Sequence, residues 1–65
     1  MRILVNEEPR DVAAATLAAV LDELGYGGAR VATAVNGDFV PAARRGALHL
    51  DEGARVEILA PMQGG

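Results

Sequence analysis

The residues that could take part in chemistry are few in this chain, and the most unusual of them close the sequence. The chain ends with ILAPMQGG, in which Gly64 and Gly65 are the two residues that lose the most conformational entropy when they are ordered. A terminal carboxyl group has a reference pKa of about 3.3 to 3.7, so at neutral pH it is an anionic nucleophile that needs no general base. The carboxylate of Gly65 is therefore the first candidate for a reactive group.

Other kinds of reactive site find little support in the composition. The chain has no cysteine, and its six positive residues are all arginine. Without cysteine there is no disulfide and no thiolate ligand, and His49 has no second histidine with which to bind a metal. The lack of lysine leaves no side-chain amine for Schiff-base chemistry. We expect no metal, no cofactor and no catalytic residues, with His49 on the surface.

Length and charge narrow the class of protein further. A chain of 65 residues forms one domain, close to the lower size limit for an unaided core. The net charge of -3 points away from nucleic-acid phosphates. No apolar run approaches the roughly 18 residues of a membrane span, and no secretion signal opens the chain. We therefore expect a soluble, cytoplasmic protein that binds neither nucleic acid nor membrane.

The elements that position the terminus can be predicted from hydrophobic periodicity, beginning with a hairpin. Alternating apolar residues predict a strand over residues 1–5. Asparagine tolerates positive φ and proline fixes its own φ, so residues 6–9 predict a tight turn. A second strand is then expected over residues 10–13, with Val12 facing inward.

One helix follows this hairpin. Thr16 can cap its first turn, and Gly25 supplies a left-handed stop after its last. Apolar residues recur at i, i+3, i+4 and i+7, namely Leu17, Val20, Leu21 and Leu24. Asp22 and Glu23 lie on the opposite side, and we expect them to be solvated without a further role.

The second half of the chain predicts three more strands. Residues 31–35 form a strand, Asn36 and Gly37 are the strongest hairpin signal in the chain, and a short strand over 38–40 ends before proline. Residues 42–51 show no clean period and predict a loop with a short helical turn, its Arg44 and Arg45 on the surface. The last strand covers 55–59, with Val56 and Ile58 inward.

This order of elements predicts an α+β fold with a mixed sheet of about five strands and one main helix packed across it. The first and last strands must then lie side by side and parallel at the centre of the sheet, with the helix in the crossover connection. That is the β-grasp, or ubiquitin-like, arrangement. We expect a β-grasp domain over residues 1–60 and a flexible tail over residues 61–65.

Five segments of the chain form a recognisable set: MRILVN, TLAAVLDELG, VATAVNGDFVP, LDEGARVEIL and the final GG, of which AVNGDFVP at 34–41 is the most specific. Together they resemble the ThiS family, the sulfur carrier proteins of thiamine biosynthesis. The resemblance implies that the Gly65 carboxylate is adenylated by an ATP-dependent, ThiF-like enzyme. A sulfur donor such as a persulfide protein would then convert it to a thiocarboxylate. A ThiG-like thiazole synthase would take this sulfur, so the chain would be a carrier co-substrate and not an enzyme.

The tail and one face of the sheet are the expected contacts with those enzymes. The residues predicted to thread into a partner together with Gly65 are Met62, Gln63 and Gly64. Five extended residues from Pro61 reach roughly 16 Å, and glycine has no Cβ to block a narrow channel. The sheet face away from the helix offers Leu4, Phe39 and Leu59 as a possible partner surface. Phe39 suits packing in the core equally well.

Two positions depart from the family pattern. Glu7 follows Asn6 where the family often has glycine, at a cost of about 1 kcal/mol if φ is positive there. Ala54 follows Gly53 where the family commonly has aspartate. Both departures concern stability more than chemistry.

Three other functions fit parts of the sequence. The sulfur carrier of molybdopterin synthesis shares the fold and the terminal glycines, but VNEEPRDVAA differs from its usual aromatic segment. A ubiquitin-like modifier would attach Gly65 to a target lysine, although this chain has no lysine on which to build chains. A plain β-grasp binding module would give the glycines no role.

Overall fold

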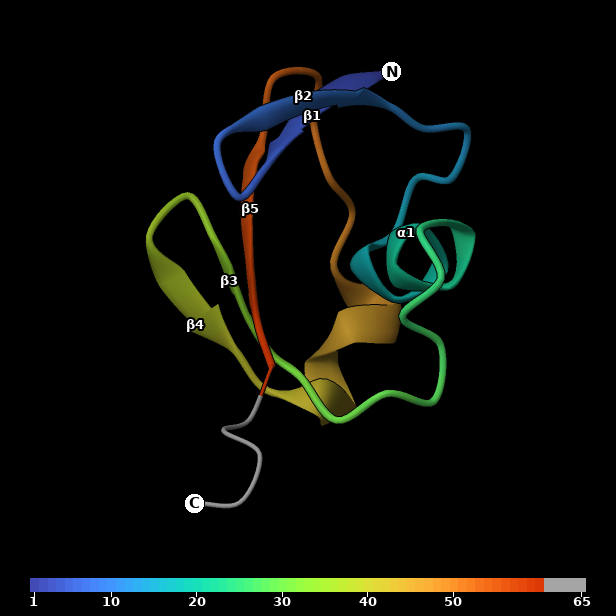
Figure 1. The fold of residues 1–65 in the computed structure, drawn as a ribbon, viewed down its shortest axis with the longest axis vertical. Coiled ribbons are helices and arrows are strands. Elements are labelled where there is room, and N and C mark those ends of the chain that lie inside the picture. The colour runs from blue at the N-terminus through green and yellow to red at the C-terminus, as the bar shows by residue number, and fades with distance from the viewer. Residues whose placement is uncertain (61–65) are drawn as a thin grey trace.

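The computed structural model of the protein describes residues 1–60, which form a five-stranded sheet with one α-helix beside it (Figure 1). The elements in chain order are β1 (Arg2–Val5), β2 (Glu8–Asp11), α1 (Leu17–Glu23), β3 (Ala32–Val35), β4 (Asp38–Val40), the 3-10 helix η1 (Ala42–Ala47) and β5 (Arg55–Leu59). The order across the sheet is β2-β1-β5-β3-β4, and the central pair β1 and β5 is parallel. The predicted β-grasp fold is confirmed.

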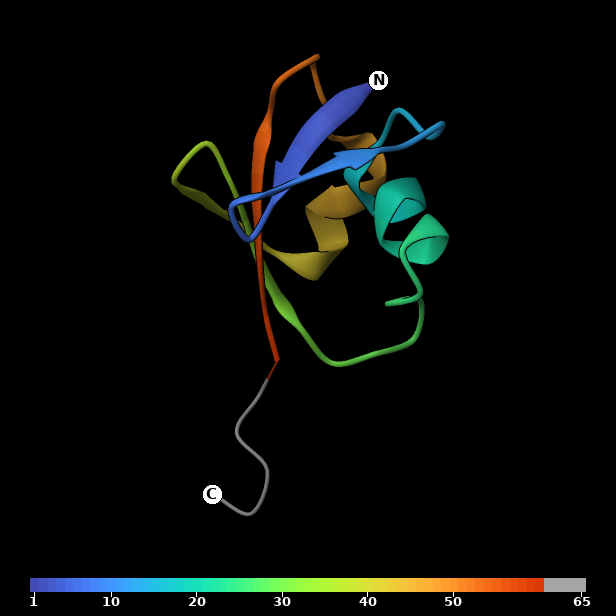
Figure 2. The ribbon, with the colours of Figure 1, turned by 45° about the horizontal axis from the view of Figure 1, so that its top comes forward.

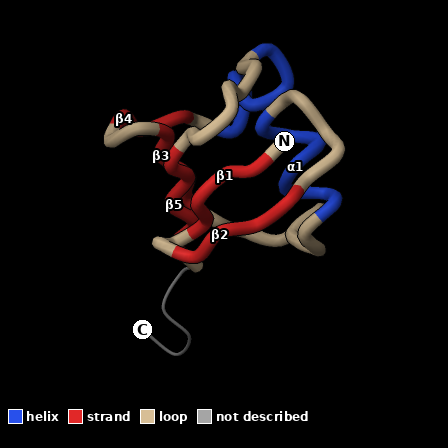
Figure 3. The backbone as a smooth tube through the Cα atoms, turned by 90° about the horizontal axis from the view of Figure 1, so that it is seen from above, coloured by secondary structure: helices blue, strands red, loops and turns tan. Residues whose placement is uncertain are grey.

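Both helices cover the same face of the sheet. Figures 1 and 2 show α1 and η1 together on one side of β5, and Figure 3 separates the strands from the helices in a view from above. The core lies between these layers. Its most buried side chains come from β1, α1, β3 and β5 and are Ile3, Leu17, Val20, Thr33 and Val56. Burial of each large aliphatic side chain contributes about 1.5–3 kcal/mol, so β5 is anchored through its inward residues.

The helix begins and ends as its sequence predicts. The Thr16 hydroxyl accepts a hydrogen bond from the Ala19 amide at 3.2 Å, and Gly25 has a φ of 93°. The expectation for Glu23 was wrong. Its carboxylate accepts hydrogen bonds from the amides of Ala13 at 3.0 Å and Ala14 at 2.9 Å. Glu23 therefore holds the connection between β2 and α1 against the helix, and these bonds lower its pKa.

The first hairpin is tighter than predicted. Its turn consists of Asn6 and Glu7 alone, both at positive φ (50° and 71°), and β2 begins at Glu8 rather than at residue 10. Pro9 lies inside β2, which is possible because β2 is an edge strand whose outer side needs no donor. Val12 is buried as predicted, one residue after the strand ends.

The predicted turn of the second hairpin is confirmed, whereas the prediction that Arg45 lies on the surface is wrong. Asn36 and Gly37 have φ values of 51° and 87°, as expected for a two-residue turn between β3 and β4. η1 occupies the predicted short helical turn. Arg44 is exposed, but Arg45 is half-buried, and its guanidinium donates to the Thr33 hydroxyl at 3.1 Å. The periodicity of a short irregular segment could not distinguish these two neighbours.

Candidate functional site

The candidate site begins where β5 leaves the sheet. β5 pairs with β3 from Val56, opposite Val35, to Leu59, opposite Ala32, and Ala60 is the last described residue. The predicted tail, including the proposed reactive Gly65 and its neighbours Met62, Gln63 and Gly64, lies outside the described residues. The structure therefore shows the strand that precedes the tail, and the tail residues stay a prediction.

Two turn asparagines hold β5 through their side chains. Asn6 accepts from the Ile58 amide at 2.8 Å and donates to the Ile58 carbonyl at 3.1 Å. Asn36 accepts from the Arg55 amide at 3.0 Å. Both asparagines lie in turns, as the tolerance of asparagine for positive φ predicts. Their bonds to β5 could not be predicted from the local sequence, since the partners are 52 and 19 residues away.

The sheet face away from the helices carries exposed apolar side chains. Phe39 is 70% exposed and Leu59 is 67% exposed, so the alternative that Phe39 packs in the core is wrong. Strand register places Ala34 opposite Phe39 and Ala32 opposite Leu59. We call these four residues the outer patch; together with Thr33 and Glu57 they line a shallow depression. The patch reaches the last residue of β5.

Leu4 is separated from the outer patch. It is half-buried in β1, opposite Arg55, which is four residues before Leu59 along β5. Arg55 and Glu57 occupy the outward positions of β5 between Leu4 and Leu59. Of the three predicted surface residues, the structure brings Phe39 and Leu59 onto one patch and leaves Leu4 outside it.

An open groove of about 550 Å³ continues from the outer patch beside the end of β5. Its lining is mostly apolar, with Val31, Ala42 and Ala60 joined by the stem of Arg45. The Arg45 guanidinium donates to the Val31 carbonyl at 2.6 Å. This bond holds η1 against the start of β3, so the groove has walls fixed by the fold.

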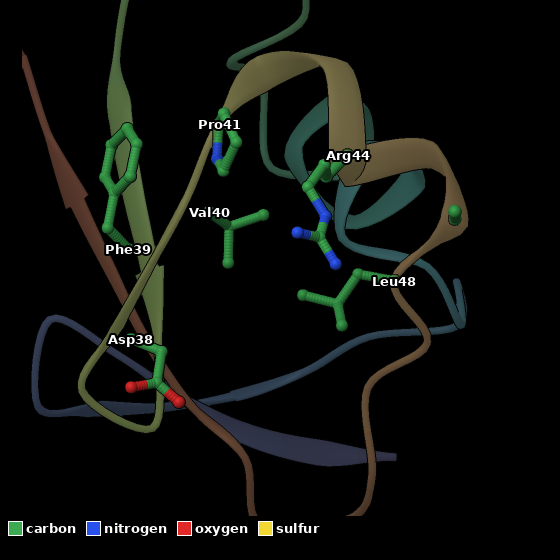
Figure 4. Close-up of a pocket in the computed structure, with 7 residues that line it drawn as sticks. Asp38, Phe39, Val40, Pro41, Arg44 and Leu48 are labelled. Carbon is green, nitrogen blue, oxygen red and sulfur yellow. The ribbon is translucent and has the colours of Figure 1, made fainter.

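A second pocket, of about 340 Å³, lies on the helix side of β4. Figure 4 shows Val40 pointing into it from β4, with Arg44 and Leu48 facing Val40, while Phe39 lies on the other side of the strand. Asp38 is the acidic member of the lining. One acid and one exposed arginine give this pocket no set of groups that would act together as nucleophile and base.

Potential metal ligands do not gather in residues 1–60. Within this part of the chain, no group of three or more histidine, cysteine, aspartate or glutamate residues could hold a metal ion. His49 is exposed, and its backbone forms an isolated bridge with Thr16. None of the helices described is long and apolar enough to cross a membrane.

Comparison with known proteins gives one consistent family. A sequence model of the ThiS family matches residues 3–65. The crystal structure of a thiamine biosynthesis protein, ThiS, from Geobacter metallireducens is similar with a TM-score of 0.83 and 29% identity, each chain being covered completely. The solution structure of a thiamine biosynthesis protein from the same organism has a TM-score of 0.79 and 28% identity, with 100% of this chain and 88% of that chain covered. None of the curated proteins matches the chain significantly.

Proposed function

Because the chain belongs to the ThiS family, we propose that it is a sulfur carrier in thiamine biosynthesis. The observation that carries this proposal is the extent of the family match, which runs to Gly65 and so includes the predicted tail. Both similar solved structures are of thiamine biosynthesis proteins, which favours this pathway over molybdopterin synthesis. The chain would act in the cytoplasm as a co-substrate of other enzymes.

The proposed reaction takes place at the Gly65 carboxylate. One carboxylate oxygen attacks the α-phosphorus of ATP, forming an acyl adenylate and releasing pyrophosphate. A persulfide sulfur of the donor then attacks the acyl carbon and AMP leaves. A thiol then attacks the donor sulfur of the resulting acyl disulfide, the S–S bond breaks, and the products are the thiocarboxylate and a disulfide between donor and thiol. The carboxylate is ionised at neutral pH, so this chain needs no catalytic base, and the adenylating enzyme supplies the groups that neutralise the phosphates.

The described part of the chain supports this role through its shape. β5 is anchored at the centre of the sheet, so the domain can stay outside an enzyme while the tail enters it. The outer patch and the adjoining groove lie at the end of β5, where the adenylating enzyme and then the thiazole synthase would dock. Exposed Phe39 and Leu59 provide the apolar area that a transient interface uses at its centre.

Intact-mass measurement tests the proposal. The protein is incubated with a ThiF-like adenylating enzyme, ATP, a persulfide donor and a thiol reductant, and we expect one oxygen to be replaced by sulfur at the C-terminus. The control is a chain that lacks Gly65, which should keep its thermal stability but lose adenylation. An unchanged mass with every component active would refute the carrier function. Adenylation of the truncated chain would show that the reacting group is wrongly assigned.

A binding measurement distinguishes a role in thiamine biosynthesis from one in molybdopterin synthesis. The thiocarboxylate form is offered to a thiazole synthase and to the large subunit of a molybdopterin synthase. We expect it to bind the thiazole synthase. Preference for the other enzyme would move the chain to molybdopterin synthesis while leaving the sulfur chemistry intact.

A further inference from the structure

β5 loses one of its two neighbouring strands before it ends. β1 pairs with β5 only through Leu4 opposite Arg55 and Val5 opposite Val56, whereas β3 pairs with β5 as far as Leu59. The Asn6 amide still donates to the Val56 carbonyl at 2.9 Å, and then the chain turns away into β2. The backbone groups of Ile58 on this side therefore face no strand within the described residues.

The side chain of Asn6 takes the place of the missing strand. Its carboxamide gives Ile58 both an acceptor, at 2.8 Å from the amide, and a donor, at 3.1 Å from the carbonyl. These are the two bonds that a parallel strand would have made. Asn6 has a φ of 50°, a conformation that asparagine adopts more readily than most residues with a Cβ.

We propose that Asn6 is a positioning residue for the tail reaction. By completing the hydrogen bonds of Ile58, it keeps the end of β5 in the sheet and fixes the direction in which the chain leaves the domain after Ala60. This role rests on the proposed sulfur-carrier function. Without the carboxamide, the last residues of β5 are held on one side only and open locally more often. A docked carrier then presents its carboxylate to the nucleotide less often.

Asn36 provides a matched control at the other end of the same strand. It also lies at positive φ in a two-residue turn, and its side chain accepts from the Arg55 amide at 3.0 Å. Arg55 is the first residue of β5, whereas Ile58 is the second to last. Glycine adopts positive φ without strain, so Asn6→Gly and Asn36→Gly each remove the carboxamide and keep the backbone conformation of the turn.

The test combines amide exchange with the kinetics of adenylation, followed as ATP-dependent pyrophosphate release. For Asn6→Gly we expect exchange at Ile58 to speed up by about tenfold or more, and kcat to fall by about five- to tenfold. KM for the carrier should change less than about twofold, because docking through the outer patch is intact. For Asn36→Gly we expect faster exchange at Arg55 and a kcat within about twofold of the original protein.

The outcomes separate this proposal from the carrier function. If the unmodified protein is adenylated and the two glycine variants have equal kcat, the positioning role is refuted and the carrier function stands. If the unmodified protein is not adenylated, both fail. Should Asn6→Gly not fold, Asn6→Asp replaces it. That variant keeps the acceptor for the Ile58 amide but places a carboxylate oxygen against the Ile58 carbonyl, so kcat should fall in the same direction.

Discussion

Replacement of Glu7 by glycine should leave the protein more stable than replacement by alanine. Glu7 has a φ of 71°, in the left-handed region where a residue with a Cβ costs about 1–2 kcal/mol. Its carboxylate lies 2.6 Å from the Arg55 guanidinium, but the two side chains are 69% and 60% exposed. An exposed ion pair of this kind contributes only a few tenths of a kcal/mol up to about 1.

The two variants separate backbone strain from the ion pair. Glu7→Ala removes the ion pair and keeps the strain, so stability should fall by a few tenths of a kcal/mol. Glu7→Gly also removes the strain, of about 1–2 kcal/mol, but adds about 0.4–1 kcal/mol of entropy to the unfolded chain. The midpoints of these two ranges favour glycine by about 0.8 kcal/mol, which corresponds to a Tm higher by about 3–6 °C for a domain of this size.

Urea unfolding and thermal unfolding followed by circular dichroism measure this difference at neutral pH. A repeat at high salt screens the ion pair, so the original protein and Glu7→Ala should then converge while Glu7→Gly keeps its advantage. If Glu7→Gly is no more stable than Glu7→Ala, the left-handed conformation stores no strain in this turn, and the reasoning from φ is refuted.

Three further substitutions test other parts of the structure. The pKa of the Glu23 carboxyl is lowered, so its contribution to stability is present above the unfolded pKa of about 4.3 and is lost as pH falls through the folded pKa. Glu23→Gln should therefore lose less stability in urea unfolding between neutral and acidic pH, and an unchanged acid slope would contradict this. Arg45→Met should lower the free energy of unfolding by about 1–2 kcal/mol because two hydrogen bonds are lost, whereas Arg44→Met should change it by less than about 0.5; equal effects would show that the bonds of Arg45 contribute nothing. Phe39→Ser should change stability by less than about 0.5 kcal/mol but weaken binding to the adenylating enzyme by about tenfold or more, as measured by calorimetry. If the affinity of Phe39→Ser for the adenylating enzyme is unchanged, the outer patch is not part of that interface.

The features of this structure that depend on residues close together in the sequence could be predicted from it. Thr16 caps the helix, and Asn36 with Gly37 makes the second turn, because each acts within a few residues of its own position. The parallel centre of the sheet also followed, since the order of strands and helix leaves few connected topologies.

The roles that escaped prediction belong to polar side chains whose partners are distant in sequence. Glu23 bonds to amides 9 and 10 residues before it, Arg45 reaches back to the start of β3, and Asn6 bonds to a strand 52 residues later. The sequence around such a side chain is the same whether the side chain is solvated or hydrogen-bonded to a backbone group, because the backbone partner is distant in the sequence. Phe39 shows the opposite case, since hydrophobicity alone could not distinguish a core residue from an exposed one.

The proline inside β2 has a consequence for how the protein behaves at high concentration. Pro9 lies opposite Leu4, one residue from the pair that closes the two-residue turn, so its nitrogen faces the free edge of the sheet. A foreign strand that tried to add to this edge would find no donor there and would meet the charges of Glu8, Arg10 and Asp11. β4, at the opposite edge, is only three residues long. Both edges therefore offer a foreign strand few backbone groups to pair with, and strand addition at high concentration is disfavoured at each of them.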